Sequence, residues 1–177
     1  PYELEKRHLS TVMHICHAGP AMGTAVAKAL FGDISPAGRC PVTWYKSMAD
    51  LCDIEDYNLF RTRSTYLYFD GEPLFPFGYG LSYTAFRYKA IKTDKQSYTS
   101  GETVNVSFEL ENVGAMDGEE VVQLYASAPA SLPFTKPKKQ LVAFSRVFVP
   151  RGERVTVELS FRADDLFVSP ETQFHGN

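Results

Sequence analysis

The first third of the chain contains the residue types that bind transition metals. His14, Cys16 and His17 lie close together, and Cys40 and Cys52 follow. Imidazole nitrogens and thiolates are the usual zinc ligands. On a strand, however, His14 and Cys16 point to one face and His17 to the other, and no Cys-x-x-Cys pair is present. The pattern therefore favours buried strand residues and a loop histidine, and we predict no metal site.

Acidic side chains gather in the middle of the chain, beside many aromatic rings. Glycosidases use two carboxylates, one as nucleophile or base and one as acid. The spacing selects no pair, and acidic residues in loops are usually just solvated, so we assign no catalytic residue. The carboxylates considered are Asp50, Asp53, Glu55, Asp56, Asp70 and Glu72.

Three further patterns carry little chemistry. Gly19 to Gly23 precede a predicted helix, where free N–H groups could bind an anion, but the spacing matches neither the dinucleotide fingerprint nor the P-loop. No Gly-x-Ser-x-Gly elbow indicates acyl transfer. Asn105-Val106-Ser107 fits the glycosylation sequon, which we attribute to chance. We therefore predict no cofactor.

Composition excludes several classes of protein. The 177 residues include 18 Lys and Arg against 21 Asp and Glu, a net charge of −3, so no basic surplus favours a nucleic-acid partner. Apolar stretches are too short to span a bilayer, and we predict no membrane partner. Three cysteines, an odd number, favour free thiols in a reducing compartment, which leans toward the cytoplasm. Because the chain opens with Pro1, we expect that it was cut or processed.

Residues 1–48 have the pattern of α/β material. The apolar run Val12 to Cys16 predicts a buried strand. Helical spacing from Thr24 to Phe31 predicts a helix with Thr24 as N-cap and Gly32 at the C-terminal cap. A strand, a turn and a helix make half of a βαβ unit, which needs neighbouring strands. We therefore expect the end of a larger α/β sandwich domain.

Residues 49–82 form a strap rich in aromatic residues, glycine and proline, which we expect to lie pinned against both neighbouring zones. From residue 83 to 177 the pattern is β only, with about six short strands. We expect Phe108, Phe144 and Phe161 to face the core, Gly114 to end the second strand and residues 150–152 to form a turn. The expected strands cover residues 86–91, 104–110, 121–125, 141–149 and 155–161.

These patterns predict a mainly β fold with a small α/β piece. The architecture expected is a fibronectin type III-like, immunoglobulin-like β-sandwich preceded by the end of an α/β sandwich domain. The chain stops soon after Asp165 and Leu166, where one more strand is expected, so we predict that the sandwich lacks its last strand. Such a gap would leave a sheet edge unpaired.

Several ordered motifs decide what the chain resembles. Residues 31–44 (FGDISPAGRCPVTW) and 66–83 (YLYFDGEPLFPFGYGLSY) are similar to two conserved passages of glycoside hydrolase family 3. Residues 111–125 (ENVGAMDGEEVVQLY), 138–147 (KKQLVAFSRV) and 164–166 (DDL) resemble its fibronectin type III-like domain. The resemblance covers the chain from about Cys16 onward. Cys40 and the turn at residues 17–23 depart from the family pattern.

The resemblance implies a retaining β-glycosidase of β-glucosidase or β-xylosidase type, acting on a β-linked oligosaccharide or glycoside without a metal or organic cofactor. It also implies that the chemistry lies elsewhere, because no position from 1 to 177 matches the family's nucleophile or acid/base motif. We expect this chain to be a C-terminal supporting module that packs on N-terminal domains and is inactive alone. A stand-alone carbohydrate-binding or adhesion module and a homo-oligomer stay open as alternatives.

Overall fold

The computed structural model describes residues 8, 10–17, 19–129, 131 and 136–166. Contacts between backbone atoms divide the chain into two compact units, residues 1–34 and 35–177. No helix among the described residues is long and apolar enough to cross a bilayer.

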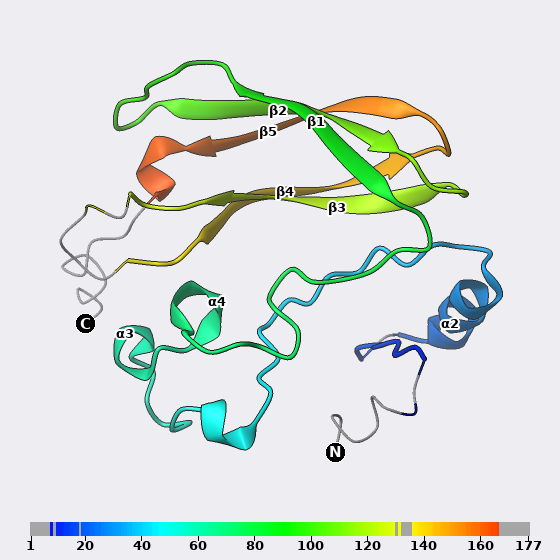
Figure 1. Cartoon of the computed structure of the whole chain (residues 1–177), viewed down its shortest axis with the longest axis horizontal. Helices are drawn as coiled ribbons and strands as arrows, with labels where there is room; N and C mark the ends of the chain where they lie inside the picture. Colours follow the sequence, from blue (N-terminus) through cyan, green and yellow to red (C-terminus); the bar gives the residue numbers. More distant parts are fainter. Residues whose placement is uncertain (1–7, 9, 18, 130, 132–135, 167–177) are drawn as a thin grey trace. The chain divides into compact units, whose positions relative to one another are not determined.

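Among the described residues of the first unit, α2 (Met22–Phe31) is the helix, shown in Figure 1. The predicted cap at Gly32 is confirmed, since its φ of 81° is left-handed and its N–H donates to the Ala29 carbonyl. The predicted N-cap at Thr24 is wrong, because the helix begins two residues earlier and Ala21 occupies the cap without a side-chain hydrogen bond.

The strand predicted at residues 12–16 is also wrong. These residues adopt no regular structure, and Val12 and Ile15 are about half exposed (52% and 46%). A parallel strand is stable only when neighbouring strands take its backbone hydrogen bonds and cover its faces. None of the described residues supplies such a neighbour, so the apolar run has nothing to pair with.

The second unit contains a β-sandwich of five described strands, where about six were expected (Figure 1). One sheet has the order β1-β2-β5 and the other pairs β3 with β4, all antiparallel. The five predicted strand positions are confirmed, as are the ends at Gly114 and residues 150–152. The strands are β1 (Phe86–Thr93), β2 (Thr103–Asn112), β3 (Gly118–Ala126), β4 (Gln140–Val149) and β5 (Arg154–Arg162), followed by the 3-10 turn η2 (Ala163–Asp165).

The core lies between the two sheets and follows the period of two in the sequence. Alternate residues of β2, from Val104 to Leu110, are buried, and Leu110 and Val122 are fully enclosed. Cross-strand register places Phe108 opposite Val157 and Val106 opposite Leu159. The predicted inward orientation is confirmed for Phe108, whereas the prediction for Phe144 is wrong. The cluster consists of Phe108, Leu110, Val122, Val149, Val157 and Leu159.

Phe144 is exposed because of its register on β4. It lies opposite Gln123, while its neighbours Ala143 and Val147 pack against the core. Side chains alternate between the two faces of a strand, so position 144 must point outward and its ring is 68% exposed. The sequence run from residue 141 to 149 is apolar on both faces, which hid this alternation.

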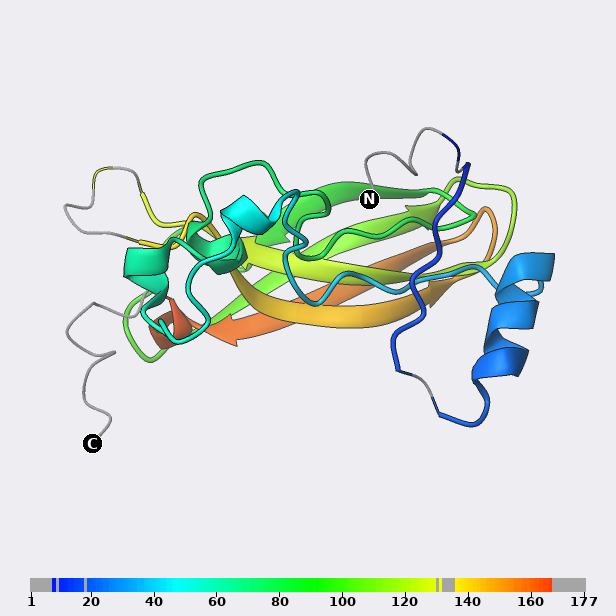
Figure 2. The ribbon, with the colours of Figure 1, turned by 90° about the horizontal axis from the view of Figure 1, so that it is seen from below.

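The strap contains short helical turns rather than one continuous loop. The 3-10 turn η1 (Met48–Asp50) precedes α3 (Leu59–Thr62) and α4 (Thr65–Tyr68) (Figure 2). The strap meets the sandwich as predicted. Tyr66 approaches Tyr125 edge-on with 6.3 Å between ring centroids, and the Lys138 N–H donates to the Leu67 carbonyl at 2.8 Å.

Candidate functional site

The candidate site lies where the segment 35–44 and the end of the strap meet β3. The two segments pair through backbone bonds: the Cys40 N–H donates to the Tyr79 carbonyl, and the Gly78 N–H donates back to Cys40, each at 2.8 Å. Farther along, the Trp44 N–H donates to the Phe75 carbonyl at 2.9 Å. Two motifs more than thirty residues apart therefore form one extended ribbon. We call the contact of this ribbon with β1 and β3 the joint.

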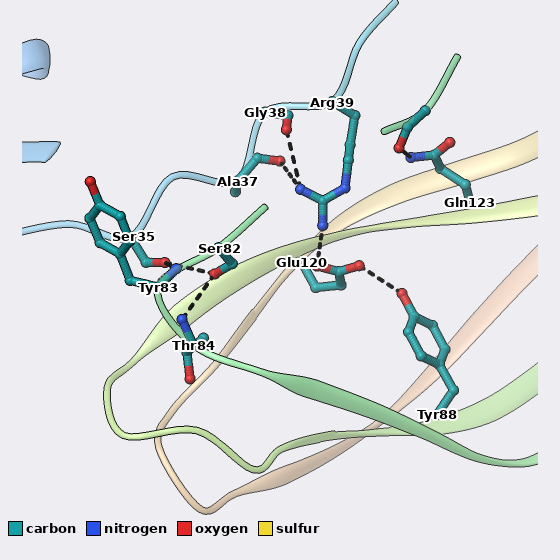
Figure 3. A network of polar contacts seen from close by, with 11 residues as sticks. Ser35, Ala37, Gly38, Arg39, Ser82, Tyr83, Thr84, Tyr88, Glu120 and Gln123 are labelled. Carbon is teal, nitrogen blue, oxygen red and sulfur yellow. Dashed lines mark hydrogen bonds and ion pairs between the residues drawn. The ribbon is translucent and has the colours of Figure 1, made fainter. Parts of the chain in front are cut away.

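An ion pair connects the ribbon to the sandwich, as Figure 3 shows. Arg39 Nη2 donates to Glu120 Oε2 at 2.5 Å, and both side chains are largely buried (13% and 12% exposed). Arg39 Nη1 also donates to the carbonyls of Ala37 and Gly38, each at 3.2 Å. The other carboxylate oxygen, Glu120 Oε1, accepts a hydrogen bond from the Tyr88 hydroxyl at 2.9 Å. Burial, together with the negative charge of Glu120, raises the pKa of Tyr88.

This network was missed by the sequence reasoning, although a signal was present. Glu120 has the same parity on β3 as Val122, which is fully buried. A carboxylate at an inward position of a strand requires a partner, because an unpaired buried charge is costly. The sequence does not show that the partner is Arg39, which is 81 residues away.

Glycines of the strap let the ribbon lie close to its neighbours. A Cβ at Gly80 would come within 2.2 Å of the Gly38 carbonyl oxygen. Gly78 has a φ of 81°, and a Cβ there would come within 2.3 Å of the Gln123 side chain. Gln123 in turn donates from Nε2 to the Gly78 carbonyl at 3.2 Å, and its Oε1 accepts from the Tyr125 hydroxyl.

A buried asparagine ties the end of the strap to the sandwich. Asn112 is fully buried, and its Oδ1 accepts from the Thr84 hydroxyl at 2.6 Å. Its Nδ2 donates to the Met116 and Val149 carbonyls, both at 2.9 Å. A Cβ at Gly114 would lie 2.1 Å from Thr84 Oγ1, which accounts for glycine there. All polar atoms of this buried amide are thus satisfied.

Five of the six carboxylates considered from the sequence are held by hydrogen bonds or ion pairs with other groups, and none of these contacts joins two of the carboxylates. Asp50 accepts from the Ser47 N–H in a capping box, and Asp53 accepts from the Glu55 N–H. Asp56 accepts from the Asn58 N–H and from Arg61 Nε. Glu72 accepts from Lys46 and Asp70 from Lys138, at 2.5 and 3.1 Å.

Electrostatics give neither Asp56 nor Asp70 the character of a general acid. The backbone bond from Asn58 and the contact with Arg61 hold the pKa of Asp56 below its usual value. The Lys138 ammonium lowers the pKa of Asp70 in the same way. A carboxyl that donates a proton near neutral pH needs a raised pKa. Asp56 and Asp70 are both shifted in the opposite direction.

The residues considered as metal ligands are divided between the two units. His14, Cys16 and His17 are exposed in the first unit, and Cys52 is exposed in the second. In the part of the chain that the structure describes, no group of three or more His, Cys, Asp or Glu side chains has metal-binding geometry. Gly19 has open space around its Cα, and its carbonyl accepts from the Met22 N–H at the start of α2.

Two family models match the chain in the order in which the structure arranges it. The glycosyl hydrolase family 3 C-terminal domain matches residues 1–83, which include the ribbon of the joint. The fibronectin type III-like domain matches residues 120–173, which begin at the ion-paired Glu120. The chain belongs to glycoside hydrolase family 3.

Relatives in this family share about a third of their residues with the chain. The thermostable beta-glucosidase B of Acetivibrio thermocellus is 37% identical over 163 residues, which cover 84% of this chain and 21% of that protein. The xylan 1,4-beta-xylosidase of Xylanibacter ruminicola is 37% identical over 162 residues, covering 92% of this chain and 18% of the relative. The family 3 chain thus spans about a fifth of the length of these relatives.

Solved structures agree with the fold. Beta-glucosidase 3B of Thermotoga neapolitana, in complex with glucose, superimposes with a TM-score of 0.73 at 32% identity, over 84% of this chain and 22% of that one. DesR, a beta-glucosidase of Streptomyces venezuelae, gives a TM-score of 0.73 at 31% identity, over 87% and 21%. The resemblance predicted from the motifs is confirmed, and parts of the motifs at residues 31–44, 66–83 and 111–125 lie in the joint.

Proposed function

We propose that this chain is the supporting module of a retaining β-glycosidase that hydrolyses terminal, non-reducing β-linked sugars, and that it does not hydrolyse them alone. The relatives named above are a β-glucosidase and a β-xylosidase, which supports the substrate class. The observation that carries the proposal is the joint: the family motifs in this chain are committed to an ion pair, backbone pairing and glycine contacts rather than to a reaction centre.

The strap presents apolar side chains that a supporting role would use. Ile54 and Tyr57 are each 87% exposed and Leu81 is 73% exposed, and Met48, which directly precedes the strap, is 82% exposed. Apolar side chains of this size gain about 1.5–3 kcal/mol when they are fully buried. We propose that they pack on the N-terminal domains of a longer enzyme, whose presence is supported by relatives about five times as long as the chain.

The three-zone division belongs to the same proposal. Residues 1–48 would complete an α/β sandwich domain, residues 49–82 would form the strap, and residues 83–177 would form a sandwich without its last strand. In this arrangement the joint holds the ribbon in place, and the ribbon in turn would position the loops of the catalytic domain.

A chimera tests the supporting role. The matched region of the Acetivibrio thermocellus enzyme is replaced by this chain, with and without Ile54→Asp and Tyr57→Asp. We expect the substituted chimera to lose soluble yield and melting temperature, while the same substitutions leave the isolated chain's melting temperature unchanged. Equal stability of the two chimeras would contradict the proposal.

A carbohydrate-binding module is the second candidate, and one observation favours it. Phe144 and Phe148 expose their rings on the same face of β4, 68% and 56%, and aromatic faces stack on sugars. Titration of the chain with xylan and cello-oligosaccharides separates the two candidates. Saturable binding that Phe144→Ala abolishes would favour the binding module. If the titration gives no heat of binding, the supporting role is favoured.

A further inference from the structure

The leading segment of the second unit, residues 35–46, contacts the rest of that unit in the way a bound peptide contacts a protein surface. It contains no helix, and its backbone pairs with the end of the strap. The Trp44 carbonyl accepts from the Leu74 N–H at 2.7 Å, in addition to the backbone bonds of the ribbon described above. When a protein recognises a peptide by strand pairing, the backbone bonds provide affinity and the side chains provide specificity.

Buried side chains in the middle of the leading segment provide the specificity. Ala37 is 4% exposed, and the Arg39 guanidinium reaches the carboxylate of Glu120 on β3. Removal of one partner of a buried charge pair leaves the other charge without compensation. The surface therefore fits a segment that places a small residue and an arginine two positions apart.

Hydrogen bonds hold both ends of the leading segment. At its first residue, Ser35 Oγ accepts from the Tyr83 N–H at 3.0 Å and lies 2.7 Å from the hydroxyl oxygen of Ser82, a contact that Figure 3 shows. Near its last residue, the Tyr45 hydroxyl accepts from the Thr65 N–H at 2.9 Å. The segment is thus held at both ends as well as in the middle.

The surface that receives the leading segment has contacts of its own. It is formed by residues 65–84 and β3. Gln123 on β3 donates to the Gly78 carbonyl, and the Thr84 hydroxyl donates to Asn112 at the end of β2. None of these contacts involves residues 35–46. A surface that is already ordered loses less entropy when it binds a ligand.

We propose that residues 65–84 and β3 form a binding surface whose ligand is the leading segment, and that this surface retains the segment without a covalent connection. The folding boundary then lies between residues 34 and 35, where the two compact units divide, rather than at residue 83, where the match to the family 3 C-terminal domain ends. Of the first zone, only residues 1–34 would depend on the longer enzyme for their partners.

The binding surface lies within the second unit and does not depend on the proposed role in a glycosidase. The chimera tests how exposed residues of the strap pack against another domain, whereas retention of the leading segment depends on contacts inside the second unit. Either can fail while the other succeeds.

The strap has an exposed tip at which the chain can be cut. Residues 51–55 are all exposed, and Ile54 is 87% exposed. Exposed loop tips accept insertions and are open to proteases. A recognition site for a sequence-specific protease, inserted between Ile54 and Glu55, would therefore allow the folded chain to be cut. The N-terminal piece then carries the leading segment, and the C-terminal piece carries the sandwich.

Size-exclusion chromatography of the cut chain over a dilution series measures the association of the two pieces. We expect the pieces to elute together after cleavage. Arg39→Met removes the counter-charge of Glu120 and should weaken the association at least about thirtyfold. Lys28→Met removes a positive charge from an exposed position of the same piece. It is the matched control and should leave the association unchanged.

A second variant removes hydrogen bonds without removing a charge. Ser35→Ala deprives the Tyr83 N–H of its acceptor and should weaken the association about tenfold. This variant keeps the test decisive if the uncut Arg39→Met chain does not fold. Near-ultraviolet circular dichroism of each uncut chain checks that the sandwich is folded before cleavage.

The proposal is overturned if the pieces without substitutions separate after cleavage, or if cleavage unfolds the sandwich. Full retention of both the Arg39→Met and the Ser35→Ala pieces would also overturn it, because the leading segment would then not be the ligand. Weaker association of the Lys28→Met piece would place the contact in the first unit and contradict the proposal.

Discussion

Two polar networks in the sandwich use similar groups and differ in burial. At the joint, Arg39, Tyr88 and Glu120 connect the ribbon to β3, with the charged side chains 13% and 12% exposed. In the loop between β1 and β2, the Asp94 carboxylate accepts from the Tyr98 hydroxyl at 2.6 Å and from the Asn105 N–H at 3.0 Å, and both hydrogen bonds are solvent-exposed. The first network joins residues 81 positions apart and the second joins residues within 11 positions.

The two networks should therefore differ in how much they contribute to the stability of the fold. A buried ion pair leaves an uncompensated charge when one partner is removed, whereas an exposed contact exchanges its partner for water. We therefore expect loss of the joint network to destabilise the fold more than loss of the loop network. Four substitutions test this contrast.

Removal of the Glu120 carboxylate should have the largest effect. Glu120→Ala leaves the Arg39 guanidinium buried without its counter-charge and deprives Tyr88 of its acceptor, so we expect a loss of about 3–5 kcal/mol. Urea unfolding of the chain measures it. The double variant R39M/E120L removes both charges and should recover most of the lost stability. If this double variant is as unstable as Glu120→Ala, packing rather than charge is responsible.

Gly80→Ala should be the next most harmful change. Its Cβ would lie 2.2 Å from the Gly38 carbonyl oxygen, a backbone atom, so the ribbon must separate. Overpacking of this kind costs about 1–3 kcal/mol. Gly19→Ala is the matched control because no atom lies within 4 Å of its Cβ. Equal melting temperatures for the two variants would contradict the proposed close contact in the joint.

Tyr88→Phe removes one hydrogen bond from the joint and leaves the ion pair intact. Hydrogen bonds to charged groups contribute about 1.5–3 kcal/mol when buried, and partial exposure of this ring places the expected loss near the lower end. The wild-type and variant chains are compared by urea unfolding at neutral pH. A loss as large as that of Glu120→Ala would mean that Tyr88, rather than Arg39, is the main partner of the carboxylate.

Asp94→Asn should have the smallest effect, and it should depend on pH. Hydrogen bonds from Tyr98 and Asn105 lower the pKa of Asp94 to about 2. Because the folded value lies below the unfolded value of about 3.9, the stabilisation is present above that pH and is lost as the pH falls through the folded value. Melting temperatures of wild type and variant should therefore converge between about pH 4 and pH 2. A constant difference across that range would contradict the assignment.

The sequence predicted the sandwich well because its signal is local. Alternation from Val104 to Leu110 and the turn at residues 150–152 determine strand positions through the period of two and through turn chemistry. The prediction of a strand at residues 12–16 was wrong for the opposite reason, because a parallel strand depends on neighbouring strands that its own sequence does not encode.

The joint could be predicted only in part. The sequence shows that the strap is rich in glycine, but the atoms that Gly78 and Gly80 approach, Gln123 and the Gly38 carbonyl, come from distant segments. The same holds for Arg39 and Glu120, whose pairing depends on how the ribbon crosses β3. The predicted orientation of Phe144 was wrong because β4 is apolar on both faces, so the sequence does not show which face points inward.

The central claim is that the chain supports a β-glycosidase without containing a reaction centre. Incubation of the purified 177-residue chain, free of other hydrolases, with nitrophenyl β-glucoside and nitrophenyl β-xyloside tests it most directly. We predict no release of nitrophenol above the uncatalysed rate, in wild type and Glu120→Ala alike. Sustained turnover that co-purifies with the folded chain would contradict the account.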